Sequence, residues 1–479
     1  MEESLLNRFL KLMSTSISDS DLELTQLGHS LGLNLVSFAE LRASQENSFI
    51  DLIRTRALEK MEKDNDNFLI NNNSFYAGSI DFMVSDEPDD KKFFLLETNG
   101  GSHRGLSIIS KKQQELLFNG YLEAINQAIK LNKHDYDKVF VLIGVPVNDG
   151  LIHEKVIMIE YFRKALKSKL YSVKIFNTEN FEKDFKADIV FLIADYKQLS
   201  YTLSFSNNWV KYKGEEVSVL IGDGIARRLN DEKFITQIKE NYHQINTIII
   251  NPIFRITDDK SLTYLASYFS KEILEKYNLR YLLFTKAFNE GDLIDKLQYL
   301  LKKYKRPFVI KPSGGSGGAG IIPVSIDDDS ANIKSNIEES KREFFAKFMK
   351  NRNPFPYTIQ EKANFSLIDW REKKHTFDLR IYLAQRNNII IPIGGLARIA
   401  RGSYSTGLNK QEFVVNLSGY NGQIEVERGI GFSEKSCKLL NLTKDDFVNL
   451  FCIGCVLFAS MVRNYEGIIN FSDWDTIIE

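Results

Sequence analysis

The chain has 479 residues, of which 43% are hydrophobic and 26% are charged. At roughly 150 residues per domain, this length allows about three domains. With only 9 Pro and 28 Gly, the composition excludes a disordered or fibrous chain. The 62 basic and 63 acidic residues nearly cancel, so the chain lacks the electropositive surface of a dedicated nucleic-acid-binding protein.

The amino end and the cysteines indicate the cellular compartment of the protein. Residues 1–4 carry no basic segment before an apolar stretch, which predicts no signal peptide. The most apolar helical run, residues 450–462, is shorter than the ~20 residues that cross a bilayer. Cys452 and Cys455 form a C-x-x-C inside that run without a second ligand pair, which favours core packing over metal or redox chemistry. We therefore expect a cytoplasmic protein that contacts no membrane.

The first third of the chain is expected to combine helices with one hairpin. Residues 1–70 have apolar positions at helical spacing. Two apolar strands at residues 75–84 and 93–96 flank a charged turn, and this pattern predicts a β-hairpin. A helix is expected over residues 111–129.

From residue 138 onward, short apolar strands alternate with amphipathic helices. The strands fall at residues 139–143, 173–176, 189–193 and 245–250, and the helices at 154–170 and 261–276. This alternation is typical of a parallel sheet with helical crossovers. A further helix at 292–304 precedes a strand at 308–312.

A lysine on a short strand, followed by a glycine-rich segment, is the most informative feature. Lys311 lies near the end of the strand, and five of the seven residues 314–320 are glycine. Glycines let backbone N–H groups approach phosphate oxygens closely, and lysine supplies a point charge. No Gly-Lys-Ser/Thr closes the segment, so it is not a Walker A loop. A flexible surface loop is the alternative, which the lysine at the end of a buried strand disfavours.

Four polar motifs follow this loop, and their order is more informative than any one of them. They are Tyr-Thr-Ile-Gln-Glu-Lys at 357–362, Phe-Asp-Leu-Arg at 377–380, Gly-Leu-Ala-Arg at 395–398 and Phe-Val-Val-Asn-Leu-Ser at 413–418. Together with the lysine strand and the glycine loop, this order resembles the ATP-grasp superfamily, whose carboxylate–amine and carboxylate–thiol ligases hold ATP between two α+β lobes.

The resemblance implies an α/β fold with two α+β lobes and assigns roles to individual residues. The expected phosphate-binding residues are Lys311, Gly314, Gly315, Ser316, Gly317 and Gly318. Gln360, Glu361 and Lys362 are expected to line the adenine pocket. Arg380 and Arg398 are expected to be catalytic, reaching the phosphates and the acyl phosphate, and Asn416 to help hold Mg²⁺.

The superfamily also needs a pair of metal-binding carboxylates, normally just after the asparagine. No such hairpin follows Asn416; a similar one lies near the amino end, with Asp81 on its first strand and Glu97 and Asn99 on its second. Asp81 and Glu97 can face each other there, and oxygen atoms are the ligands that Mg²⁺ takes. The alternative is an ordinary edge hairpin. The rotated order predicts a circularly permuted ATP-grasp protein.

Several weaker signals remain open. Asp473 or Asp475 lies in a segment that echoes the first hairpin strand and is the second candidate for the metal site. Asn251 and Asp259 resemble the segment before an ATP-grasp domain, although Asp259 also suits a helix N-terminus. Arg227, Arg228, His103 and Arg104 are candidates for substrate or phosphate contact, against the simpler interpretation as solvated surface residues.

These features predict three domains and one type of reaction. The domains are a helical and hairpin region (residues 1–136), a Rossmann-like domain (137–285) and the ATP-grasp lobes (286–479). The expected reaction is ADP-forming ligation of a carboxylate to an amine or thiol, with ATP and one or two Mg²⁺ ions. The resemblance favours amino-acid or peptide ligases of natural-product pathways, such as the pheganomycin type. Alternatives are loading of an amino acid such as glutamate onto a carrier protein, an ATP-grasp kinase, or a non-catalytic nucleotide-binding protein. A homodimer is possible.

Overall fold

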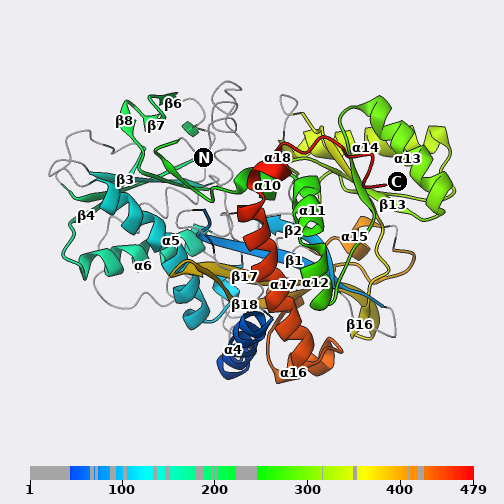
Figure 1. Ribbon diagram of the computed structural model, residues 1–479, viewed down its shortest axis with the longest axis horizontal. Coiled ribbons are helices and arrows are strands. Elements are labelled where there is room, and N and C mark those ends of the chain that lie inside the picture. The colour runs from blue at the N-terminus through cyan, green and yellow to red at the C-terminus, as the bar shows by residue number, and fades with distance from the viewer. Residues whose placement is uncertain are drawn as a thin grey trace, which may run out of the picture.

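The structure is a computed structural model of the whole chain. It describes residues 44–64, 70, 74–86, 93–100, 105–132, 138–145, 152–178, 181, 187–195, 198–199, 202–222, 245–315, 317–348, 353–407, 409–415, 417 and 425–478. Three main sheets organise this part of the chain (Figure 1). The mixed α/β class expected from the sequence is confirmed.

A seven-stranded sheet, the large sheet, forms the centre. Its order is β11-β2-β1-β17-β18-β19, and β16 pairs with β17. The strands are β1 (Ala77–Val84), β2 (Phe93–Asn99), β11 (Leu279–Arg280), β16 (Leu367–Trp370), β17 (Lys373–Arg386), β18 (Ile389–Ile399) and β19 (Gly429–Gly431). The expected hairpin is confirmed as β1 and β2, and β1 pairs antiparallel with β17, some 300 residues away in sequence. The large sheet thus draws on each of the three segments that the sequence delimits.

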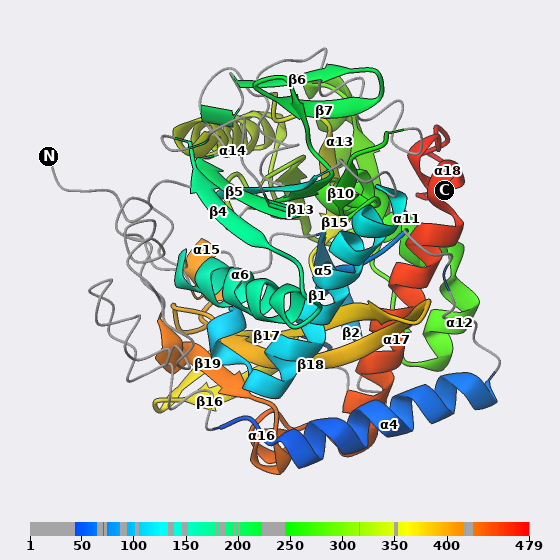
Figure 2. The ribbon, with the colours of Figure 1, turned by 90° about the vertical axis from the view of Figure 1, so that its left-hand side faces the viewer.

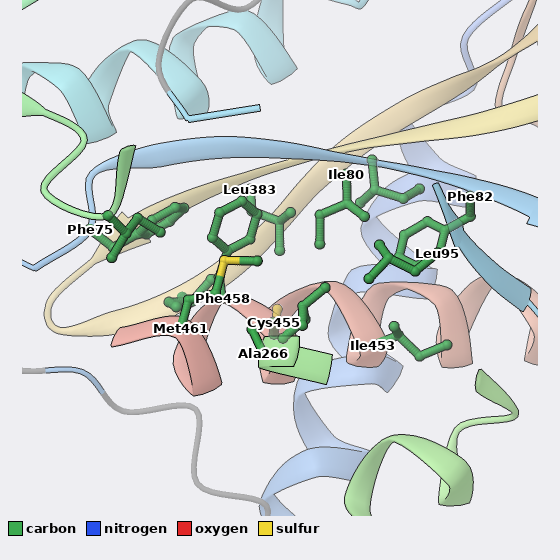
Figure 3. Close-up of a cluster of buried hydrophobic side chains, with 14 of the residues drawn as sticks. Phe75, Ile80, Phe82, Leu95, Ala266, Leu383, Ile453, Cys455, Phe458 and Met461 are labelled. Atoms are coloured by element: carbon green, nitrogen blue, oxygen red, sulfur yellow. The ribbon is translucent and has the colours of Figure 1, made fainter. Parts of the chain in front are cut away.

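One face of the large sheet is apolar and packs on helices α4 (Asn47–Lys63) and α17 (Lys444–Arg463). Side chains from β1, β2 and β17 meet those of α17 in one cluster (Figure 3). Among the described helices, α17 is the one long and apolar enough to cross a membrane, but 89% of its apolar window is buried, as in a core helix. Cys452 and Cys455 are fully buried on it, which confirms their interpretation as core residues.

A five-stranded parallel sheet lies beside the large sheet, as expected from the alternation after residue 138. Its order is β10-β9-β3-β5-β4, the strands being β3 (Val139–Val145), β4 (Val173–Asn177), β5 (Ile189–Asp195), β9 (Val219–Ile221) and β10 (Ile248–Ile250). Helix α6 (Ile152–Lys167) packs on it, and α5 (Lys111–Leu131) lies between it and the large sheet, opposite α4 and α17 (Figure 2). A short sheet of β6 (Leu203–Ser206), β7 (Trp209–Tyr212) and β8 (Glu215–Glu216) is attached.

A four-stranded antiparallel sheet, the small sheet, carries the lysine strand. Its order is β12-β15-β13-β14, from β12 (Phe284–Ala287), β13 (Phe308–Pro312), β14 (Ile322–Val324) and β15 (Tyr357–Glu361). Helices α13 (Glu290–Tyr304) and α14 (Ser330–Phe348) supply its separate apolar core. The lysine strand, the Gln-Glu strand and the helix before them are therefore confirmed as elements.

Two expectations for the region between the sheets were wrong. The helix expected over 261–276 is two helices, α11 (Lys260–Phe269) and α12 (Lys271–Lys276), because the backbone of Ser270 leaves the helical conformation. The strand expected over 245–250 is shorter, since only residues 248–250 pair with β9. In the described part of the chain, the remaining helices are α10 (Phe254–Asp258), α15 (Lys410–Phe413), α16 (Glu434–Leu439) and α18 (Tyr465–Ile469), with 3₁₀ turns at Leu106–Ile108 and Val426–Arg428.

Candidate functional site

Lys311 projects from β13 into a buried polar environment. Its Nζ donates hydrogen bonds to the hydroxyl of Tyr264 at 2.8 Å and to Oε1 of Gln360 at 2.5 Å. Burial and, to a lesser extent, the charge of Lys260 lower the pKa of Lys311 to about 7, against the opposing effect of Glu97. The amine is therefore poised to gain a proton when an anion approaches.

The glycine loop after β13 uses backbone conformations that favour glycine. Gly314, Gly317, Gly318 and Gly320 have φ angles of 61°, 61°, 74° and 75°. A Cβ on Gly318 would lie 2.7 Å from Cγ1 of Val414, so the loop packs closely on the segment that follows α15. Glycine is thus required here for both conformation and contact. Ser316 lies outside the described residues.

The β1–β2 hairpin places its carboxylates opposite one another, as expected. Asp81 pairs with Glu97, and Ser79 with Asn99. The register shifts between Asp81 and Phe82, which leaves Leu96 as the extra residue of a β-bulge. This bulge sends Leu95 to the apolar face and Glu97 to the polar face, although strict alternation would put both on one face.

Tyr264 and Lys260, both on α11, connect the two sheets. The hydroxyl of Tyr264 donates to the carbonyl oxygen of the bulged Leu96 and accepts from Lys311. Lys260 Nζ lies 3.3 Å from the carbonyl oxygen of Gly315 and 3.4 Å from Oε2 of Glu97. The glycine loop and the hairpin carboxylate are therefore joined by one lysine side chain.

Sequence analysis missed Lys260 as a site residue. Its signal was its place directly after Asp259, in the Asp-Lys-Ser that opens α11. Asp259 does act at the helix N-terminus, because its Oδ1 accepts from the backbone N–H of Ser261 at 3.0 Å. Its second oxygen pairs with Lys286 at 2.7 Å, so Asp259 holds the start of α11 against β12.

A buried cluster of two arginines and two aspartates occupies the polar face of the large sheet next to Glu97. Nε and Nη2 of Arg380 donate to the two oxygens of Asp81 at 2.7 and 2.6 Å. Arg398 donates to both oxygens of Asp378, and its Nη2 also lies 2.8 Å from Oδ2 of Asp81. Burial alone would raise the pKa of Asp81, but the two guanidinium groups outweigh it and lower that pKa to about 2.

The expected adenine-pocket residues lie at the end of β15, where the small sheet meets the large one. Gln360 is buried against Lys311, as described above. Glu361 pairs with Arg306 at 2.6 Å, and its Oε2 accepts from the backbone N–H of Leu283 at 3.3 Å. Lys362 is half-buried, and its backbone N–H donates to the carbonyl oxygen of Pro307 at 2.9 Å. Their contact with adenine stays a prediction.

Several candidates cannot be placed, and one lies elsewhere. Asn416, His103, Arg104, Arg227 and Arg228 lie outside the described residues. Asp475, from the echo at the carboxyl end, pairs with Lys296 of α13 at 3.1 Å and is 70% exposed. Asp473 is also exposed. The hairpin is the candidate that the structure brings to the glycine loop.

The donor atoms around Glu97 fit a Mg²⁺ ion that shares its coordination with phosphates. Among the described residues, no three or more His, Cys, Asp or Glu side chains are grouped to hold a metal. Mg²⁺ needs only one or two protein carboxylates when phosphates complete its shell. Glu97 is 34% exposed, and Nδ2 of Asn99 is buried with no hydrogen-bond partner among the residues that the structure describes. Asp81 is held by two arginines, so its role as a ligand stays a prediction.

Comparison with known proteins finds solved structures similar to this chain but no matching family model. No known protein family and no curated protein matches it. A glutathione synthetase-like effector from Globodera pallida in its apo form overlaps 76% of this chain and 81% of its own, with a TM-score of 0.37 and 13% identity.

Two further solved structures contain nucleotides. The biotin carboxylase domain of Hydrogenobacter thermophilus 2-oxoglutarate carboxylase, in complex with MgADP, ADP and bicarbonate, overlaps 66% of this chain and 69% of its own (TM-score 0.28, 11% identity). Carboxyaminoimidazole ribonucleotide synthase from Aspergillus clavatus, complexed with ATP, overlaps 57% and 60% (TM-score 0.24, 13% identity). All three are ATP-grasp proteins, the superfamily that the motifs resemble. Similarity this low says nothing about function, so the argument for a function must come from the residues of the site.

Proposed function

We propose that the chain is an ATP-dependent ligase of the ATP-grasp type. It would join a carboxylate to an amine or thiol through an acyl phosphate and release ADP. The observation that carries the proposal is the connection between the two sheets. Lys260 contacts both the glycine loop after Lys311 and Glu97 of the hairpin, so the expected phosphate-binding and metal-binding residues share one site.

The small-sheet side of this site suits the phosphates of ATP. Lys311 and Lys260 can supply two cations, and the loop glycines place no side chains between the backbone and an approaching phosphate. Both lysines are largely buried, and a charge is more effective where water is excluded. This pair would bind the phosphates and hold them in place.

The large-sheet side suits the reacting group. Arg398 lies close enough to Glu97 for their charges to interact, and Arg380 is joined to Arg398 through Asp81. When bound, Mg²⁺ would offset phosphate charge beside Glu97 and Asn99. Arg380 and Arg398 would stabilise the charge that develops on the transferred phosphoryl group and on the acyl phosphate.

The proposed reaction has two steps. A substrate carboxylate oxygen attacks the γ-phosphorus, and the bond from that phosphorus to the bridging oxygen breaks, so that the electron pair leaves with ADP. The amine or thiol then attacks the acyl carbon, the bond from that carbon to the phosphate oxygen breaks, phosphate leaves with the electron pair, and the nucleophile loses a proton to solvent. The chain's contribution is to hold the reactants in line and to neutralise charge.

The finer assignment concerns substrate and context. We propose an amino acid or peptide as the carboxylate, in a natural-product pathway, with a cytoplasmic location; a carrier-protein thiol is the second candidate acceptor. This step rests on the order of the motifs in the chain. A kinase would use the same phosphate contacts and leave a stable phosphoester. A non-catalytic protein would have no need for Glu97 and Asn99 beside the loop.

Product analysis tests the proposal. The full-length chain is incubated with Mg²⁺, ATP and pooled amino acids, and nucleotides and conjugates are resolved by mass spectrometry. The proposal predicts ADP, phosphate and a new amide or thioester. AMP with pyrophosphate would exclude the acyl-phosphate route, and a phosphorylated alcohol would identify a kinase. The Lys311→Ala variant is the matched control, since it should fold but lose both nucleotide binding and product.

A further inference from the structure

Asp378 is a buried carboxylate that none of the expected roles uses. It lies on β17, directly opposite Arg398 of β18 in the sheet register. Its Oδ1 accepts from Nε of Arg398 at 2.7 Å, and its Oδ2 accepts from Nη2 of the same guanidinium. Among the described residues, Asp378 has no other hydrogen bond or ion pair, and Asp378 and Arg398 are each less than 10% exposed.

This pair is not explained by the stability of the sheet. A buried ion pair gains little net free energy, because removing both charges from water offsets their attraction. The opposite face of the same strands shows what a stabilising pair looks like here, since Leu379 opposes Ala397 and Phe377 opposes Ile399 in the apolar core. A charged pair at the adjacent register position therefore serves orientation better than stability.

The contacts fix the Nε–Nη2 edge of the Arg398 guanidinium and leave Nη1 available to a ligand. Asp378 engages Nε and Nη2, and Asp81 engages Nη2. Nη1 has no protein acceptor within the described part of the chain. Because guanidinium is planar, holding the Nε–Nη2 edge sets the direction of the Nη1 donors.

Asp81 and Asp378 differ in the number of arginines that each one binds. Asp81 binds Arg380 and Arg398 together and lies in the hairpin beside Glu97, whereas Asp378 binds Arg398 alone. If a ligand draws Asp81 away, Arg398 keeps its bidentate partner. Asp378 thus gives Arg398 an orientation that does not depend on what happens at the hairpin.

We propose that Asp378 is a positioning residue, which holds Arg398 so that its Nη1 group faces the reacting phosphoryl group. This inference rests on the proposed function. It assigns Asp378 no direct contact with substrate. All its effect on turnover passes through Arg398.

A double-mutant cycle tests this dependence. We expect Asp378→Asn to lower the rate of ADP release from Mg·ATP with pooled amino acids by about 10- to 100-fold, because an amide can accept only one of the two Arg398 bonds. Affinity for Mg·AMPPNP, measured by calorimetry, should change less than threefold. In the Arg398→Ala background, Asp378→Asn should have no further effect on the rate. Additive losses in the two backgrounds would overturn the proposal.

Two further measurements separate positioning from folding. The double variant Asp378→Leu with Arg398→Met replaces the pair by apolar side chains and should fold and bind Mg·AMPPNP, yet show the rate of Arg398→Ala. Unfolding of this variant would overturn the proposal, since the pair would then be structural. Asp369→Asn, at an exposed ion pair with Lys374, is the charge-matched control and should leave the rate unchanged.

A crystal structure of the Asp378→Asn variant decides the inference even without turnover. The Arg398 guanidinium should rotate or lose order while the strands stay in register. An unchanged guanidinium would contradict a positioning role. If the parent chain neither binds Mg·ATP nor releases ADP, the proposed function fails, and this structure still tests the orientation of Arg398.

Discussion

The two faces of the large sheet are built from alternate residues of the same strands, and around Asp378 and Arg380 their chemistry is opposite. On β17, Leu379, Ile381 and Leu383 belong to the apolar core, and Leu383 is seen beside α17 in Figure 3. Asp378 and Arg380 lie on the other face in the charged cluster.

The apolar face stabilises the fold through burial alone. Replacing the buried charges of the other face with apolar side chains of similar size would leave the stability about the same. The second face also packs on α5 through Tyr382 and Ala384, so only its charged part is free of a role in the core. The comparison indicates that this charged part carries the function and the apolar surfaces carry the fold.

A substitution at Phe458 should disrupt the packing of the apolar face most strongly. Its ring packs on Phe75 with centroids 4.6 Å apart and leaves no space at Gly78, where a Cβ would lie 2.5 Å from it. Phe458→Ala should lower the free energy of unfolding by about 3–5 kcal/mol, since it creates a buried cavity. Urea unfolding followed by circular dichroism measures this. Leu131→Ala, at a side chain that is 65% exposed, is the control and should change stability by less than about 0.5 kcal/mol.

The polar face should respond in activity and not in stability. Glu97→Gln keeps the shape and one acceptor oxygen but removes the anion that suits a hard dication. We expect about a 100-fold loss of Mg²⁺-dependent ADP release, with nucleotide affinity largely retained and the unfolding midpoint unchanged. Glu372→Gln, exposed in the turn between β16 and β17, is the matched control. Equal turnover in both variants would contradict the role of Glu97.

Lys311 makes nucleotide binding dependent on pH. Since its pKa in the free protein is lowered to about 7, phosphate binding above pH 7 requires proton uptake. Affinity for Mg·ADP should therefore fall by up to about tenfold per pH unit above 7. Titration calorimetry in buffers of different ionisation enthalpy measures the uptake, which should approach one proton near pH 8. Lys311→Arg should abolish the dependence, because guanidinium stays charged.

The lowered pKa of Lys311 also predicts the direction in which stability changes with pH. Between pH 7 and 10.5, the unfolded chain binds a proton at Lys311 that the folded chain does not. The contribution of this group to the free energy of unfolding therefore rises with pH over that window. Lys311→Met should remove this rise, and an unchanged slope in the variant would exclude Lys311 as its source.

The smallest effect is expected at the carboxyl end. Asp475 is exposed and pairs with Lys296 on the small-sheet side. Asp475→Asn should change ADP release less than twofold and unfolding free energy by less than about 0.5 kcal/mol. A large loss of Mg²⁺-dependent turnover would instead move the metal site to this segment.

The sequence predicted elements better than it predicted the positions of side chains. The hairpin, the lysine strand and the Gln-Glu strand follow from local patterns of apolar residues and glycines, so they were found. The bulge at Leu96 was not, because only the pairing with β1 reveals that one residue is extra. It changes the face on which Glu97 lies, which no alternation rule would give.

The missed residues share a cause, which is that their partners are distant in sequence. Lys260 gains its role from Gly315 and Glu97, which lie 55 and 163 positions away. Asp378 gains its role from a neighbouring strand, and the Phe-Asp-Leu-Arg motif gave it no role. Such contacts depend on tertiary packing and leave no periodic signal along the chain.

The central claim is that the hairpin and the glycine loop form one nucleotide site. A crystal structure of the full chain with Mn²⁺ and AMPPNP, using the anomalous signal of Mn²⁺ to locate the ion, tests it most directly. The account predicts an ion coordinated by Glu97 and by phosphate oxygens that also contact Lys311. An ion bound at Asp473 or Asp475, or a nucleotide held away from the glycine loop, would contradict it.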